Sequence, residues 1–270
     1  MATSNINHKS NQTALITGAS SGMGLEFARQ LAGKGYALAL LGNRRDELSS
    51  AAEQISLDFG VQVAQLCIDL SLHGAAETVL HWCDEKGIQP DILINNAGMF
   101  FMEYLSVATL DKARAMMSLH MNVVTELCIM FGDRMKERGS GRILNMSSMT
   151  AETPAPGIAI YSASKAYLKS FGKGLSYEMR PFGVSVTTVC PAAVDTGLYP
   201  LGDRLRTLLR RIGVLRTPQW LVRRALRAMF RGRRTMSPGL MNLILPPLVA
   251  ILPARLKDRL GLRWIYRQGR

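Results

Sequence analysis

The sequence lacks most features of a secreted, metal-binding or membrane-spanning protein. Four cysteines occur in 270 residues, and none of them forms a CxxC pair or stands near a cluster of histidines. A disulfide framework and a metal site are therefore not expected, and a reducing cytoplasm is the simplest setting. Residues 1–12 are polar and lack the apolar segment of a signal peptide.

Long apolar runs and C-terminal acidic residues are also scarce. The longest apolar run, Leu243–Pro253, has 11 residues with three prolines, whereas a membrane-spanning helix needs about 20 apolar residues. Residues 201–270 hold 17 Lys and Arg but 2 Asp and Glu, against 16 and 18 in residues 1–200. The excess in the net charge of +13 therefore lies in the last quarter, which predicts an anionic partner there.

What is present is a regular alternation of apolar and amphipathic segments, with an apolar fraction of 47% that suits a globular protein. We expect strands at 13–17, 36–42, 61–68, 91–95, 142–147 and 184–190, and helices at 25–33, 46–59, 74–86, 109–138 and 162–180. The strands are apolar along their length, as parallel strands buried on both faces are. This order predicts an α/β fold with a doubly wound parallel sheet. One domain at 13–200 would follow a flexible N-terminus (1–12) and precede a basic helical extension (201–270).

A glycine-rich turn, TGASSGMG at 17–24, follows the first expected strand and opens a helix. Gly18 allows the tight turn, Gly22 a close backbone approach and Gly24 close helix packing. The helix N-terminus would then meet the pyrophosphate of a dinucleotide. The other loop residues expected at the cofactor are Ser20, Ser21 and Met23. For the glycines alone, the alternative is an ordinary strand-to-helix turn.

The ends of the second and third strands bear on the choice of dinucleotide. NAD enzymes usually place a carboxylate after the second strand for the ribose 2′-hydroxyl, but here Asn43, Arg44 and Arg45 follow it. Guanidinium groups suit a 2′-phosphate, so we expect NADP(H), the alternative being two solvated arginines at a helix start. Asp69 ends the third strand, where it could bind the adenine amino group or stabilise a turn.

Proton-transfer chemistry is indicated by Tyr161 and Lys165 in YSASK, which share a helix face at a spacing of four. A phenol has a reference pKa of about 10, and a neighbouring ammonium lowers that pKa. Ser147 and Ser148 end the fifth strand, where a hydroxyl could hold a substrate carbonyl or merely cap a turn. Asn122 lies in an apolar helix, where it either holds a water that feeds protons to Lys165 or bends the helix.

Together these motifs resemble the short-chain dehydrogenase/reductase family over roughly residues 11–200. The resemblance rests on TGASSGMG, Asp69-Leu70, NNAG (95–98), Asn122, the serine pair, YSASK and PAAVDT (191–196). It implies a Rossmann fold and an NADP(H)-dependent oxidoreductase that passes hydride between nicotinamide and a carbonyl or carbinol carbon. Ser148 stands 13 residues before Tyr161, as the family's catalytic serine does, which favours Ser148 over Ser147.

The resemblance also implies a role for each matching residue. Tyr161 would be the acid in reduction and Ser148 would polarise the carbonyl. Lys165 would bind the nicotinamide ribose and lower the pKa of the tyrosine, while Asn122 would anchor a proton-relay water. The remaining residues expected at the cofactor are Asp69, Leu70, Asn95, Asn96, Ala97, Gly98, Pro191, Val194 and Thr196. Ala192 replaces the family's usual glycine, which could crowd the nicotinamide.

The region after residue 195 bears on the substrate and on partners. By resemblance, residues 195–240 form a substrate lid. With the apolar loop MFFM at 99–102, the lid suggests a bulky apolar substrate, unless its apolar side chains pack onto the body or form an oligomer contact. The stretch 219–231, QWLVRRALRAMFR, is expected to form a basic amphipathic helix, and it is followed by LILPPLVAILP (243–253) and RLKDRLGLRWIYRQGR (255–270). Together these segments of residues 201–270 resemble a peripheral anchor on an anionic membrane. No reader motif or aromatic-interleaved basic groove supports nucleic-acid binding.

Three functions are compatible with this sequence. The first is the NADP(H)-dependent interconversion of a lipid- or steroid-like ketone and its secondary alcohol, by a cytoplasmic and peripherally membrane-associated enzyme. The second is a 3-oxoacyl or 3-ketosphinganine-type reductase of lipid synthesis. The third is an NADP-binding sensor or scaffold, which the full set of Asn122, Ser148, Tyr161 and Lys165 disfavours. Homo-oligomers through the helices at 109–138 and 162–180 are expected from the resemblance.

Overall fold

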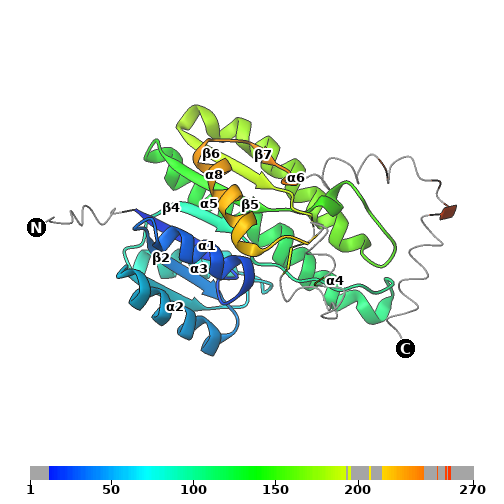
Figure 1. Cartoon of the computed structure of the whole chain (residues 1–270), viewed down its shortest axis with the longest axis horizontal. Helices are drawn as coiled ribbons and strands as arrows, with labels where there is room; N and C mark the ends of the chain where they lie inside the picture. Colours follow the sequence, from blue (N-terminus) through cyan, green and yellow to red (C-terminus); the bar gives the residue numbers. More distant parts are fainter. Residues whose placement is uncertain are drawn as a thin grey trace, which may run out of the picture.

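The computed structural model describes residues 12–192, 194–195 and 215–239, with the isolated positions 207, 248, 253 and 255–256. Its centre is a parallel seven-stranded sheet of order β3-β2-β1-β4-β5-β6-β7 (Figure 1). The strands are β1 Thr13–Thr17, β2 Ala37–Gly42, β3 Val63–Cys67, β4 Pro90–Asn95, β5 Gly141–Met146, β6 Val184–Val189 and β7 Thr235–Met236. This arrangement confirms the expected doubly wound α/β fold.

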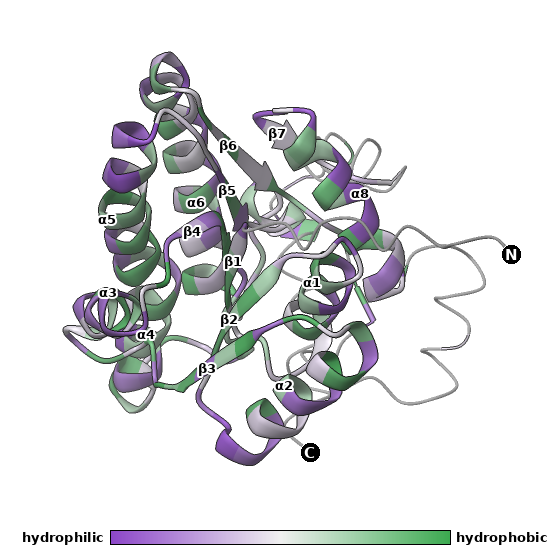
Figure 2. Cartoon of the chain, turned by 90° about the vertical axis from the view of Figure 1, so that its left-hand side faces the viewer, coloured by the Kyte–Doolittle hydropathy of each residue, from purple (hydrophilic) through white to green (hydrophobic). Residues whose placement is uncertain are grey.

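The central strands are apolar at successive positions because both faces of the sheet are covered. In β1, Ala14 and Ile16 belong to one hydrophobic core, and Leu15 between them belongs to the other. Figure 2 shows helices on the two sides of the sheet. One side carries α1 Gly22–Ala32, α2 Arg45–Phe59 and α8 Pro218–Phe230, and the other carries α3 Ala75–Glu85, α4 Leu110–Met117, α5 Val123–Glu137 and α6 Ala159–Met179.

The helix expected at 109–138 is interrupted. The short turn η1 Val107–Thr109 leads into α4, and the π-helical turn η2 Ser118–Asn122 separates α4 from α5. By length and apolar composition alone, Val107–Glu137 could cross a membrane. However, α5 buries Leu127 and Phe131 in the core that it forms with the sheet and α6. Core packing therefore accounts for part of the apolar character of this segment, while Ile129 of α5 is exposed.

The described part of the C-terminal region packs onto the domain. β7, which the sequence pattern did not predict, pairs in parallel with the end of β6. The helix expected at 219–231 is present as α8, but its apolar side chains lie in the core together with α1; they are Leu221, Val222, Ala225, Leu226 and Met229. The membrane-anchor interpretation is therefore wrong for this apolar face, because the protein itself covers it. Most of the remaining extension lies outside the described residues.

Candidate active site

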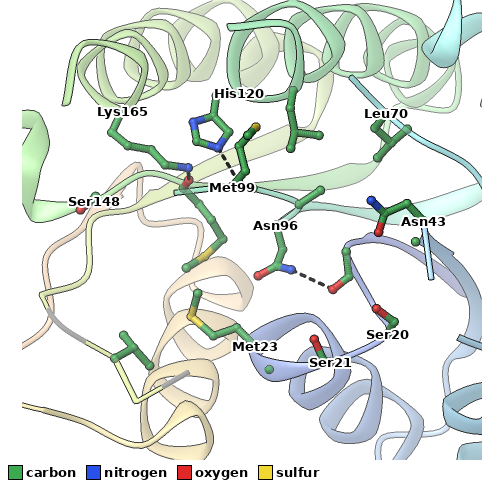
Figure 3. Close-up of a pocket in the computed structure, with 18 of the residues that line it drawn as sticks. Ser20, Ser21, Met23, Asn43, Leu70, Asn96, Met99, His120, Ser148 and Lys165 are labelled. Carbon is green, nitrogen blue, oxygen red and sulfur yellow. Dashed lines mark hydrogen bonds between the residues drawn. The ribbon is translucent and has the colours of Figure 1, made fainter. Parts of the chain in front are cut away.

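One cavity of about 590 Å³ opens at the carboxyl ends of the strands (Figure 3). The strand order reverses between β1 and β4, which is where ligands bind in doubly wound folds. Of the residues expected from the sequence, the cavity is lined by Gly18, Ser20, Ser21, Gly22, Met23, Asn43, Arg44, Asp69, Leu70, Asn96, Ala97, Gly98, Ser148, Tyr161, Lys165, Pro191 and Val194. Distant segments of the chain thus meet at one edge of the sheet.

The glycine turn is shaped to receive an anion. Gly18 has φ +65° and Gly22 has φ +56°, in the left-handed region that favours glycine. A Cβ on Gly24 would overlap the carbonyl oxygen of Gly18, so Gly24 does not line the cavity but lets α1 start against the turn, as expected. Ser21 makes no side-chain capping bond at the start of α1. The first N–H groups of a helix have no partner within it, and here they are available to a phosphate.

Asn96 fixes this turn to the end of β4. Its backbone N–H donates to Thr17 Oγ1 at 2.9 Å, and its side-chain amide donates to the Thr17 carbonyl oxygen at 3.0 Å. Asn95 was expected at the cofactor but does not line the cavity. Its buried side chain instead donates to Asn145 Oδ1 at 2.8 Å. Asn145 lies opposite Asn95 on the neighbouring strand β5, so this hydrogen bond holds the Asn95 side chain between the two strands.

Arg44 lies across the glycine turn. Its Nη2 donates to Ser21 Oγ at 2.5 Å and to Ser20 Oγ at 3.2 Å, and its Nη1 pairs with Glu47 at 2.7 Å. Arg45 is exposed and is absent from the cavity lining. Of the two arginines expected at the cofactor, Arg44 thus lines the cavity, whereas Arg45, the first residue of α2, does not, and its contact with the cofactor stays a prediction.

Asp69 lines the cavity and also stabilises a turn. Its Oδ1 accepts hydrogen bonds from the Ser71 N–H at 2.9 Å and from the Ser71 hydroxyl at 2.7 Å. Asp69 thus stabilises a turn, which is one of the two roles that its place in the sequence allows. Because Asp69 also lines the cavity, its carboxylate stays within reach of a bound ligand.

Tyr161 and Lys165 lie on one face of α6, and they are only 4% and 5% exposed. Lys165 Nζ donates to the Met146 carbonyl oxygen at 3.0 Å and lies 5.6 Å from the centroid of the Tyr161 ring. Burial lowers the pKa of Lys165 to about 8, because desolvation disfavours the ammonium form. The two groups therefore share one water-poor site, as their spacing predicts.

The two serines after β5 have different surroundings. Ser147 Oγ donates to the Lys165 carbonyl oxygen at 2.6 Å. The hydroxyl proton of Ser147 is therefore engaged with the backbone of α6. Ser148 precedes the short turn η3 Met149–Ala151, and its Oγ accepts from the Thr150 N–H at 3.2 Å. A hydroxyl can accept and donate at once, so Ser148 can still donate its proton to a ligand. The geometry thus favours Ser148, the serine chosen from the sequence.

The side chains of Asn122 and His120 lie on different sides of the same helix. Asn122 is exposed and does not line the cavity, whereas His120 is fully buried and does. Because residue 120 is buried and residue 122 is exposed, their side chains point to different sides of the helix. The Asn122 side chain is therefore directed away from Lys165, and a role of Asn122 in a proton relay stays a prediction. A lone histidine in an apolar helix was the signal for His120, because a buried polar group needs partners.

His120 has a partner at each ring nitrogen (Figure 3). Its Nε2 accepts from the Met99 N–H at 3.0 Å, and its Nδ1 lies 2.9 Å from Ser164 Oγ. The edge of the Tyr161 ring meets the imidazole at 5.8 Å between centroids. Burial, and then the charge of Lys165, lower the pKa of His120 well below its usual range. The ring is therefore neutral at physiological pH.

An apolar wall adjoins the tyrosine. Phe100 meets the edge of the Tyr161 ring at 5.0 Å between centroids and an angle of 88°. Phe100 belongs to a hydrophobic cluster with Met99, Phe101, Met102, Met116, Ile158 and Ile160. Pro191, Ala192 and Val194 also line the cavity, and Thr196 lies outside the described residues. Of the loop MFFM, Met99 lines the cavity and Phe100 contacts Tyr161, so the bulky apolar substrate that this loop suggests stays a prediction.

Comparison with known proteins identifies the family. The family model for short chain dehydrogenases matches residues 12–200. The chain belongs to the short-chain dehydrogenase family. As a member of it, the protein is an oxidoreductase, as the motifs predict. A very-long-chain 3-oxoacyl-CoA reductase of Anas platyrhynchos is 32% identical over 189 residues, which cover 68% of this chain and 60% of that protein. The chain thus matches less than two thirds of that relative's length.

Two solved structures extend the likeness beyond the matched core. A short-chain dehydrogenase from Sphingobium yanoikuyae in complex with NADPH is 27% identical, with a TM-score of 0.74, over 90% of this chain and 97% of that one. A bulky-bulky ketone specific alcohol dehydrogenase from Comamonas testosteroni is 26% identical, with a TM-score of 0.73, over 90% of this chain and 95% of that one.

Proposed function

We propose that the protein is an NADP(H)-dependent oxidoreductase that interconverts a bulky apolar ketone and its secondary alcohol. The observation that carries this proposal is the meeting of Tyr161, Lys165 and Ser148 in the same cavity as the glycine turn. A proton donor, a charged group that tunes it and a carbonyl-orienting hydroxyl thus stand beside a dinucleotide site. A sensor or scaffold that only binds NADP(H) has no need of this set.

The residues present fit NADP(H). The start of α1 and the close turn at Gly18 and Gly22 suit the pyrophosphate. Arg44, with the hydroxyls of Ser20 and Ser21 beside it, forms a group of hydrogen-bond donors for a 2′-phosphate. The NADPH complex of the Sphingobium yanoikuyae relative supports this choice. When bound, the nicotinamide supplies or accepts the hydride.

The side chains of the cavity would then move and hold the proton. Tyr161 Oη gives a proton to the carbonyl oxygen in reduction and takes it back in oxidation. Lys165, whose pKa is about 8, is mostly an ammonium at neutral pH, and its charge favours the phenolate form of Tyr161. Ser148 donates a hydrogen bond to the same carbonyl oxygen. Burial of Tyr161 and Lys165 keeps water from weakening these interactions.

The apolar wall supports a bulky substrate. Met99, Phe100 and the side chains that pack with them border Tyr161, so the carbon skeleton next to the carbonyl would meet apolar surface. The Comamonas testosteroni relative is named as specific for bulky-bulky ketones. A second candidate, the reduction of 3-oxoacyl thioesters, is favoured by the 32% identity with a very-long-chain 3-oxoacyl-CoA reductase. Both candidates place an apolar chain along this wall.

Two further properties belong to this proposal. Large apolar side chains are exposed on α5 and α6, including Ile129 at 51% and Tyr177 at 51%, which supports a homo-oligomer through these helices.

The exposed arginines of α8, among them Arg223 and Arg227, support peripheral attraction to an anionic membrane surface by charge rather than by apolar insertion. Flotation with anionic liposomes at low salt tests the membrane, and sedimentation tests the assembly.

Turnover with defined cofactors tests the reaction. The purified protein is incubated with NADPH or NADH and with a panel of steroids, other bulky ketones and 3-oxoacyl thioesters. We expect loss of NADPH absorbance in preference to NADH, and its abolition in Tyr161→Phe. The thioester and ketone arms distinguish the two substrate classes. NADPH binding without turnover of any member of the panel, or full activity in Tyr161→Phe, would contradict the proposal.

A further inference from the structure

His120 joins two parts of the cavity wall that are distant in sequence. On one side its Nε2 accepts from the Met99 N–H at 3.0 Å, where the apolar wall begins. On the other side its Nδ1 lies 2.9 Å from Ser164 Oγ, which itself donates to the Tyr161 carbonyl oxygen at 2.8 Å. One fully buried side chain therefore connects the wall to the residue that would donate the proton.

These bonds define the protonation state of the ring. The single hydroxyl proton of Ser164 is given to the Tyr161 carbonyl oxygen, so Ser164 must accept from His120, and Nδ1 must carry a hydrogen. The Met99 amide is a donor, so Nε2 must be without one. Both contacts are satisfied together only by a neutral imidazole with its hydrogen on Nδ1. The titratable groups that face the ring, Lys165 and Tyr161 of α6, are consistent with this form because a second cation beside Lys165 is disfavoured.

The space around the ring is also limited. A Cβ on Gly98 would lie 3.1 Å from His120 Nε2 and 3.8 Å from Lys165 Nζ. The imidazole is thus confined by Gly98, by the Met99 amide and by Ser164, with the Tyr161 ring at its edge. It lies at a π-helical turn, a feature that occurs frequently at functional sites. A side chain held on so many sides has one orientation.

The geometry points to His120 as a positioning residue that sets the apolar wall and Tyr161 in one fixed relation. This inference rests on the proposed function, because the relation matters only if a substrate carbonyl is placed by the wall and protonated by Tyr161. Loss of the two hydrogen bonds would let the wall and α6 shift relative to each other. A misplacement of about 1 Å costs on the order of 100-fold in rate, so kcat would fall while NADPH affinity stays unchanged.

Three variants test the role by kinetics. His120→Leu keeps the size of the side chain but makes no hydrogen bonds, and we expect kcat to fall on the order of 100-fold with the Kd for NADPH unchanged. His120→Gln can accept from Met99 and donate to Ser164, and it should recover part of the loss. His81→Leu, the same substitution at an exposed histidine of α3 that does not line the cavity, is the matched control and should behave as the parent protein. Full kcat in His120→Leu would overturn the inference.

An independent measurement uses the protein without cofactor or substrate. The chain has four histidines, so NMR of isotopically labelled imidazoles can identify His120 by its absence in His120→Gln. We expect the neutral Nδ1–H tautomer across neutral pH, and a mixture of tautomers in Ser164→Ala. A protonated ring or the Nε2–H tautomer would overturn the inference. If His120→Leu does not fold, as judged by circular dichroism, the kcat of Ser164→Ala decides in its place, and a drop supports the role.

The two proposals fail in different ways. If the parent protein binds NADPH but reduces no ketone or thioester, the proposed function is wrong, while the tautomer still shows whether His120 is arranged as described. If the parent protein is active and the His120 variants are equally active, the proposed function stands and the positioning role is wrong.

Discussion

The choice between NADP(H) and NAD(H) depends on Arg44, and the chain offers a matched control in the next residue. Arg44 lines the cavity and donates to the hydroxyls of Ser20 and Ser21, whereas Arg45 does not line the cavity, and both side chains are exposed. Replacing each arginine by alanine removes the same charge from neighbouring positions. We expect Arg44→Ala to weaken NADPH binding and Arg45→Ala to leave it unchanged.

The size of the effect follows from the contacts. A hydrogen bond to a charged group contributes about 1.5–3 kcal/mol, and about 1.4 kcal/mol corresponds to tenfold in Kd. The Arg44 side chain is 50% exposed and already paired with Glu47, so solvent and this carboxylate reduce the net gain. We therefore take the lower end, a roughly tenfold rise in the Kd for NADPH.

Fluorescence titration of each variant with NADPH and with NADH measures this selectivity. The Kd for NADH should stay the same in Arg44→Ala, because NADH has no 2′-phosphate. The preference of the parent protein for NADPH over NADH should also fall as the salt concentration rises, because an ion pair between Arg44 and the 2′-phosphate would be partly exposed to solvent. Equal losses for the two cofactors in Arg44→Ala, or an equal loss of NADPH affinity in Arg45→Ala, would refute this account of the site.

Three further predictions concern packing and pH. Gly24→Ala should abolish NADPH binding and lower the free energy of unfolding by about 1–3 kcal/mol, because the new Cβ would overlap the Gly18 carbonyl oxygen of the preceding turn. Gly33→Ala is the control, because Gly33 lies at the other end of α1 with φ −62°. It should leave NADPH binding intact in the same titration. Gly172→Ala in α6 should lower the free energy of unfolding measured in urea, because the new Cβ would overlap Thr188 Oγ1 of β6. Gly174→Ala, which meets nothing within 4 Å, should stabilise by about 0.4–1 kcal/mol, and the opposite order would contradict the packing. The pKa of Lys165 is about 8 in the folded protein, against an ordinary value of 10.5. Between pH 8 and 10.5 the unfolded chain therefore binds more protons than the folded protein. The free energy of unfolding should rise with pH across that window, by an amount on the order of 3 kcal/mol. Urea unfolding at both ends of the window should show a smaller rise in Lys165→Met, and an identical rise in both proteins would exclude the lysine as its cause.

Several parts of the molecule could be predicted from the sequence because their signals are local. The fully apolar strands follow from burial on both faces of a parallel sheet. The roles of Gly18 and Gly24 follow from turn geometry and helix packing, and the shared face of Tyr161 and Lys165 follows from a spacing of four in a helix. These features depend on residues a few positions apart, so periodicity and motif spacing were enough to find them.

Other parts were decided by packing between distant segments. Which side chain of the π-helical turn faces the cavity depends on how that turn packs against α6, and composition does not show that His120 does so while Asn122 is exposed. The apolar face of α8 has the same periodicity whether it meets lipid or protein, and only the packing against α1 shows which. β7 is two residues long, and among the described strands it pairs with β6 only. Sequence thus determined which chemical groups are available, and the tertiary structure determined which of them meet, because contacts at long sequence separation depend on the whole fold.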